Sequence, residues 1–149
     1  MKLIPLALAA VLTFPVAVSV AAQGEEAFKA ECSACHIAYP SGFLPMRSWK
    51  AIMSDLSNHF GEDATLDEAT RAEIEAYLVS HAADTKGTPR WLKSVPETET
   101  PLRITEFGWF THEHGSRMKA RVAADPAIGS MSNCAACHKG AERGFFDDD

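Results

Sequence analysis

The four cysteines of the chain form two pairs, and each pair has the spacing C-x-x-C with a histidine directly after it. The two motifs are CSACH at residues 32–36 and CAACH at residues 134–138. This pattern is typical of c-type haem attachment, in which each cysteine forms a thioether bond to the haem and the histidine binds the iron. The sequence therefore predicts two covalent haem c groups, attached at Cys32, Cys35, Cys134 and Cys137 and ligated by His36 and His138.

Other uses of paired cysteines fit the sequence less well. Disulfides are common in small exported proteins. However, a disulfide within a C-x-x-C pair would close only a very short loop, and both histidines would have no role. A zinc site would have to unite two pairs that lie about a hundred residues apart. A thioredoxin-like redox pair is expected in a βαβ context, and the sequence contains no strand pattern.

The second ligand of each iron decides between a closed electron carrier and a site that is open to gas or substrate. The candidates are the remaining histidines and four methionines: His59, His81, His112, His114, Met46, Met53, Met118 and Met131. Residues 48–60 are predicted to form one helix, with Ser48 as its N-cap. On it His59 shares an apolar face with Trp49 and Leu56. A buried imidazole needs a metal or a hydrogen-bond partner, so we predict His59 as a ligand.

A further helix is predicted over residues 105–124, where two histidines stand close together. His114 recurs with Phe110 and Met118 at intervals of four, which places it on the apolar face. His112 instead shares a face with charged residues. We therefore predict His114, rather than His112, as the other second ligand.

His81 competes with these two histidines because it continues an apolar stripe on a helix predicted over residues 66–83, with Asp67 as its cap. Its place at the helix end also suits a ring that interacts with the helix dipole. Met53 and Met118 are predicted to be core residues. The residues alone leave methionine ligation at one iron open.

Residues 1–22 have the layout of a secretory signal peptide, with a lysine after Met1, an apolar run, and small residues before a predicted cleavage at Gln23. The alternative is an uncleaved membrane anchor, but Pro5 and Pro15 disfavour a continuous spanning helix. No other stretch reaches spanning length. We expect an exported, periplasmic protein without a membrane span.

The fold class expected for the mature chain is all-α, with short helices around two haems, long loops and a Pro-rich linker. We predict an N-terminal haem lobe at residues 23–83, a linker or wrapping segment at 84–104, and a C-terminal haem lobe at 105–149. Lobes this small leave little room for a protein core, and a haem in each would supply the missing apolar body.

The mature chain is acidic, since removal of Lys2 with the signal changes the formal net charge from −6 to −7. Nucleic acid is not expected as a partner, because phosphate binding needs a basic surface. An acidic surface favours a redox partner that carries a basic patch.

Three segments resemble the small dihaem cytochromes c of the DHC type known from purple bacteria: CSACHIAYPSGFLPMRSWKAIMSDLSNHFGEDATLD, RITEFGWFTHEH and MSNCAACHKGAERGFF. The similarity covers nearly the whole mature chain. It implies a periplasmic electron carrier with two bis-histidine haems, in which His59 and His114 are the distal ligands. Their assignment to the nearer haem in sequence leaves a crossed arrangement open.

The resemblance also implies redox partners. Electrons would come from a membrane b-type cytochrome and pass to a small monohaem, oxygen-binding cytochrome. The rival interpretation is an enzyme, namely a peroxidase-like or gas-binding dihaem protein with one open iron.

Overall fold

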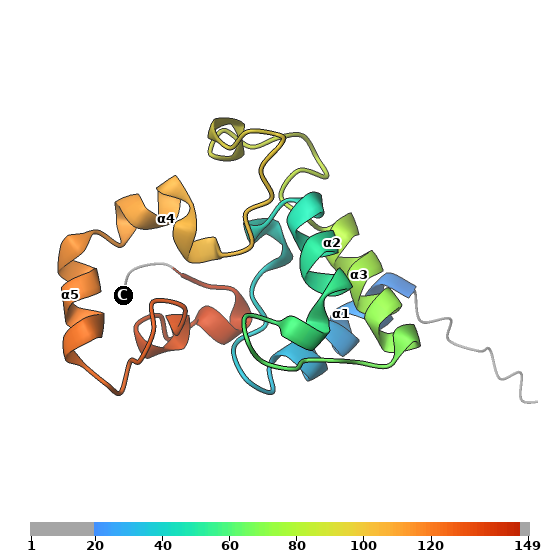
Figure 1. Cartoon of the computed structure of the whole chain (residues 1–149), viewed down its shortest axis with the longest axis horizontal. Coiled ribbons are helices and arrows are strands. Elements are labelled where there is room, and N and C mark those ends of the chain that lie inside the picture. Colours follow the sequence, from blue (N-terminus) through green and yellow to red (C-terminus); the bar gives the residue numbers. More distant parts are fainter. Residues whose placement is uncertain (1–19, 147–149) are drawn as a thin grey trace, which may run out of the picture.

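The computed structural model describes residues 20–146, and in this part of the chain the regular structure is helical (Figure 1). The α-helices are α1 (Val20–Cys32), α2 (Met46–Ser54), α3 (Glu68–Ser80), α4 (Gly108–Glu113) and α5 (Ser116–Ala124). Short 3₁₀ helices lie between and after them: η1 (Ser41–Phe43), η2 (Leu56–Asn58), η3 (Leu92–Ser94), η4 (Ile104–Glu106), η5 (Cys134–Ala136) and η6 (Ala141–Arg143). The all-α prediction is confirmed.

The predicted signal peptide falls almost wholly outside the described residues, and its last three positions form the start of α1. Among the helices of residues 20–146, none is long and apolar enough to cross a membrane.

Helices α1, α2 and α3 lie together on one side of the molecule, and α4 and α5 lie on the other (Figure 1). α1 crosses α3 at Gly24, where an added Cβ would lie 2.8 Å from both the Glu73 carbonyl oxygen and the Tyr77 Cβ. The crossing therefore requires glycine. α3 begins as predicted, since the Asp67 carboxylate accepts a hydrogen bond from the Thr70 backbone N–H at 3.1 Å.

One apolar core joins the first three helices to the linker and to α4. Its buried members are Phe28, Leu44, Trp49, Met53, Ile74, Leu78, Ala82, Leu92, Phe107 and Phe110. Leu92 belongs to the predicted linker, and Phe107 and Phe110 belong to the predicted C-terminal lobe. The linker is thus packed against the core. The division of the chain into two lobes stays a prediction.

The helix predicted over residues 48–60 is wrong in both bounds. α2 begins two residues earlier, after Pro45, and Ser48 is buried inside it instead of capping it. α2 ends at Ser54 because the chain leaves the helical conformation at Asp55, whose N–H is bonded to the Ile52 carbonyl. His59 consequently lies beyond the helix, after η2.

The helix predicted over residues 105–124 is divided into η4, α4 and α5. α4 ends at Glu113 with His114 as its C-cap, and Gly115 has an extended backbone with ψ −170°. Glycine has a low helix propensity, so this position is a natural place for the chain to turn. His114 therefore lies at a corner between two short helices rather than in the middle of one.

Candidate functional site

The first cysteine motif starts at the end of a helix and the second at the start of one, and neither motif contains a disulfide bond. Cys32 is the last residue of α1, and a turn carries the rest of the motif. Cys134 begins η5, and the His138 backbone N–H donates to the Cys134 carbonyl at 2.8 Å. All four thiols are free. Within residues 20–146 no group of three or more His, Cys, Asp or Glu is arranged to hold a metal, so the structure offers no zinc-type cluster.

The imidazole of His36 is in the tautomer that a metal ligand requires. Its Nδ1 lies 2.6 Å from the Ile37 carbonyl oxygen, and because a carbonyl oxygen can only accept, Nδ1 carries the proton. Nε2 is then left with a free lone pair. A backbone carbonyl that fixes the tautomer in this way is the usual support of a metal-binding histidine.

His59 faces His36 from a turn rather than from a helix. Its backbone N–H donates to the Glu62 carbonyl at 2.8 Å, and the Glu62 N–H donates back at 3.2 Å. The ring centroids of His36 and His59 are 6.1 Å apart, and the ring planes are inclined by 24°. Burial lowers the pKa of His59, with smaller contributions from His36 and Arg103, which favours the neutral ring that binds metal.

A second pair of imidazoles is formed by His114 and His138. Their ring centroids are 6.0 Å apart, and the planes are inclined by 70°. The His114 ring stacks on Phe110 at 4.1 Å, and its Nδ1 lies 3.1 Å from the Phe110 carbonyl oxygen, which again leaves Nε2 free. Both histidines line a cavity of about 390 Å³ together with Cys134 and Cys137.

The spacing of both pairs fits one iron ion between two imidazoles. A metal–nitrogen bond of about 2.0 Å and a ring radius of about 1.2 Å place the centroids of two opposed ligands about 6.4 Å apart. The observed values are 6.1 and 6.0 Å. These imidazole pairs would hold the iron of a haem, and the porphyrin would supply the remaining nitrogen donors. The donor sets present here therefore fit haem, with the cysteine pair of each motif beside one of the histidines.

The other candidate ligands have different surroundings. His81 is exposed at the end of α3, and its Nδ1 lies 2.9 Å from the Tyr77 carbonyl, which is the local helix-end role weighed above. His112 is exposed on α4 and does not line the cavity. Met53 is buried in the core as predicted, whereas Met118 lines the second cavity beside His114. The ligand assignment stays a prediction.

Sequence reasoning missed the aromatic wall of the second cavity. Tyr39 and Phe43 follow the first haem motif, yet both line the cavity of the second. Phe43 contacts Trp109 and Phe146, with centroids 5.6 and 5.2 Å away, and Phe146 in turn contacts the His138 ring at 5.7 Å. No local signal marks these residues, because their roles arise only when distant segments pack together.

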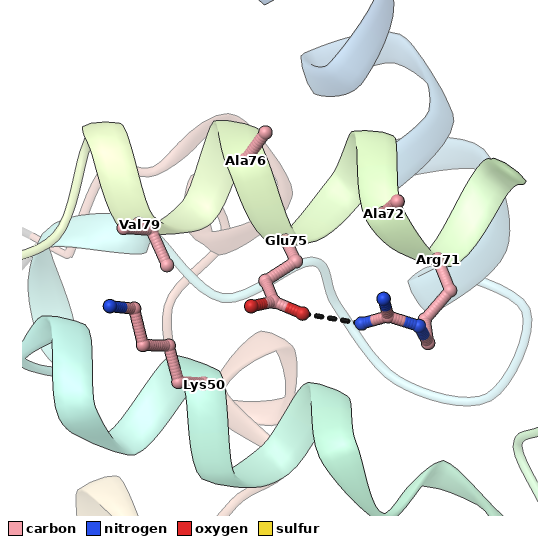
Figure 2. A pocket seen from close by; sticks show the side chains of 6 residues that line it. All are labelled: Lys50, Arg71, Ala72, Glu75, Ala76 and Val79. Atoms are coloured by element: carbon pink, nitrogen blue, oxygen red, sulfur yellow. Dashed lines mark hydrogen bonds and ion pairs between the residues drawn. The ribbon is translucent and has the colours of Figure 1, made fainter. Parts of the chain in front are cut away.

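A shallower pocket of about 230 Å³ lies between α2 and α3, and Figure 2 shows the residues that line it. Arg71 forms ion pairs with Glu75 and with Glu68, and Lys50 approaches from α2. No cysteine or histidine lines it. It is a charged surface of the helix pair and offers no haem ligand.

A helical protein with two C-x-x-C-H segments, each of which faces a further histidine, has the site of a dihaem c-type cytochrome. The family model for dihaem cytochrome c (DHC) matches residues 28–146, and the chain belongs to this family. It accordingly carries two covalently bound c-type haems with iron. The resemblance noted from the sequence is confirmed.

Solved structures of the family are similar to this chain. A diheme cytochrome c from Rhodobacter sphaeroides is 55% identical with a TM-score of 0.75, and the match covers 81% of this chain and 95% of that one. A crystal structure of DHC purified from the same organism is 52% identical with a TM-score of 0.65, and the match covers 81% of this chain and 96% of that one. A diheme cytochrome type c from Shewanella baltica OS155 is 40% identical with a TM-score of 0.68, and the match covers 83% of this chain and 88% of that one. No curated protein matches the chain.

Proposed function

We propose that this cytochrome is an outer-sphere electron carrier in which both haem irons are saturated by two histidines. The observation that carries the proposal is the spacing of the imidazole pairs, His36 with His59 and His138 with His114. Rings 6.1 and 6.0 Å apart leave space for one iron and for no substrate between them. Each haem supplies a reversible one-electron couple, and the protein's part is to hold the ligands and exclude others.

Two imidazoles also set the range of the potentials. Histidine–methionine ligation raises the potential of a haem, so bis-histidine ligation places both sites on the lower side. The sites have different surroundings: His59 is anchored by a backbone pair with Glu62, whereas His114 is stacked on Phe110 in an aromatic cavity. We expect two distinct potentials for this reason.

The partners that we propose follow from the resemblance and from charge. A membrane b-type cytochrome would donate electrons, and a small monohaem, oxygen-binding cytochrome would accept them. Residues 23–83 contain ten acidic and four basic residues, so this part of the surface would attract a partner with a basic patch. We also propose that residues 1–22 direct export to the periplasm and are removed, which mass spectrometry of the purified protein would test by showing Gln23 as the first residue.

Carbon monoxide binding tests the carrier function directly. Saturated irons leave the Soret band of the reduced protein unchanged under carbon monoxide. A new band would favour the alternative, a peroxidase-like or gas-binding dihaem enzyme with one open iron. Haem staining after denaturing electrophoresis checks covalent attachment, and a colourless band would contradict it.

Low-temperature EPR of the oxidised protein reports the ligands of both irons at once. We expect two low-spin signals of different shape, because the imidazole planes are inclined by 24° in one pair and by 70° in the other. The relative orientation of two axial imidazoles governs the splitting of the iron d orbitals and therefore the anisotropy of the signal. A high-spin signal from either iron would reject bis-histidine ligation at that haem.

A further inference from the structure

Tyr39 contacts the attachment segments of both haems. It lies three residues after His36, and its ring stacks on the His36 imidazole with centroids 4.8 Å apart and planes inclined by 20°. Its hydroxyl donates a hydrogen bond of 2.7 Å to the Ser132 carbonyl, two residues before Cys134. One half-buried side chain thus joins segments that are 93 residues apart in sequence.

The acceptor of this hydrogen bond is held in a bonded turn. The hydroxyls of Ser130 and Ser132 are 2.7 Å apart, and the Ser132 N–H donates to the Ser130 hydroxyl at 3.1 Å. The Asn133 side chain donates to the Ile128 carbonyl at 3.0 Å. Because the Ser132 carbonyl is held in this turn, the hydrogen bond from Tyr39 also restricts the position of Cys134, two residues further along the chain.

The donor is equally constrained. The Tyr39 ring is held against the His36 imidazole, and its hydroxyl, protonated like any tyrosine at neutral pH, donates to the Ser132 carbonyl. Phe43, at the end of η1, packs against Trp109 and Phe146 and lines the second cavity together with Tyr39. The aromatic contacts bury apolar surface without fixing a direction. The hydrogen bond of the tyrosine hydroxyl is directional and therefore favours one arrangement of the two segments.

We propose that Tyr39 is a positioning residue for electron transfer between the two haems. It fixes the second attachment segment against the first ligand pair, and so sets the separation across which an electron passes within the molecule. The inference rests on the proposed two-haem carrier function and adds to it the residue that couples the two sites. Electron tunnelling weakens steeply with distance, so a small loosening of this contact has a measurable effect on rate.

The test compares Tyr39→Phe and Tyr39→Leu with Tyr77→Phe in the full holoprotein. Tyr77 is the other tyrosine of the chain and packs against Phe28 and His81, which makes it a matched control for loss of a hydroxyl. Exchange spectroscopy by NMR on the haem methyl signals of the partly reduced protein measures the rate of electron exchange between the haems. EPR and carbon monoxide binding report the ligands of each haem separately.

We expect the Phe variant, which loses only one neutral hydrogen bond, to exchange electrons about threefold more slowly than wild type, and the Leu variant, which also loses the ring stacked on His36, about tenfold more slowly. Both should keep two low-spin signals, and Tyr77→Phe should retain the wild-type rate. A wild-type rate in the Leu variant would overturn the proposal. So would loss of the first low-spin signal, because Tyr39 would then serve only to hold His36.

Two further outcomes are separable. Should the Leu variant fail to fold, the Phe variant keeps the ring and decides alone, since an unchanged rate there contradicts the proposal. Failure of the carrier function appears in the wild type instead, as carbon monoxide binding or a high-spin iron before any substitution at Tyr39 is made.

Discussion

Removal of the predicted distal ligands should open one haem at a time. In His59→Ala the ring 6.1 Å from His36 is lost, and in His114→Ala the ring 6.0 Å from His138 is lost. Each variant should show one high-spin and one low-spin iron in the EPR spectrum of the oxidised protein, because the other pair is untouched. The potential of the opened haem should rise as one imidazole is withdrawn.

The expected size of the effect is the number of carbon monoxide molecules bound per protein. The reduced wild type should bind no carbon monoxide, each single variant about one molecule per protein, and the double variant about two. Titration followed at the Soret band measures these values. Free imidazole should restore the low-spin spectrum best in His114→Ala, since the Phe110 ring lies parallel to the vacated ring position at 4.1 Å, whereas Phe60 meets the His59 ring edge-on at 66°.

The remaining histidines provide matched controls. His81→Ala and His112→Ala alter exposed imidazoles that lie on α3 and α4, and both should retain two low-spin irons and bind no carbon monoxide. The reasoning from ring spacing is refuted if His81→Ala opens a haem while His59→Ala and His114→Ala do not. A variant with two opened haems would indicate that the ligand pairs depend on each other.

Three more predictions concern packing and docking. Gly140→Ala would place a Cβ 2.7 Å from the Phe145 Cβ, so we expect a loss of about 1–3 kcal/mol in unfolding free energy, whereas Gly42→Ala, with open space around it, should be near neutral by thermal melting. Ile74→Ala should lower the free energy of unfolding by about 2–5 kcal/mol in denaturant titrations, because the side chain is fully buried. Leu102→Ala is the control, since this leucine is 39% exposed. Equal stability of the two variants would contradict the assignment of Ile74 to the core. Electron transfer to a basic partner protein should slow as salt is raised in stopped-flow experiments, and a rate independent of ionic strength would exclude electrostatic steering by the acidic surface.

The chemistry of this protein could be predicted from the sequence because it is local. Cysteines and histidine within five consecutive residues define each attachment site, and no distant contact is needed to recognise them. The spacing of Phe110 and His114 placed both residues on one apolar face, and in the structure their rings stack at 4.1 Å.

The helix bounds could not be predicted so well. Apolar spacing continued through Asp55 and Gly115, but the chain turns at both positions. The prediction of His59 as a ligand rested on a helix face, but the structure places His59 beyond the helix. It lies near His36 from a turn that is closed by hydrogen bonds with Glu62. Periodicity reports which residues are apolar, while hydrogen bonds at helix ends decide where a helix stops.

The sequence by itself determined that two haems are attached and that the fold is helical, and it predicted the attachment residues, because motif spacing and apolar periodicity are properties of short segments. The tertiary structure decided which imidazoles face each other and how the two sites are joined. Tyr39 and Ser132 meet only after about ninety intervening residues have packed into helices and loops. The free energy of such a contact depends on the whole fold, and so it has no signature in the residues around it.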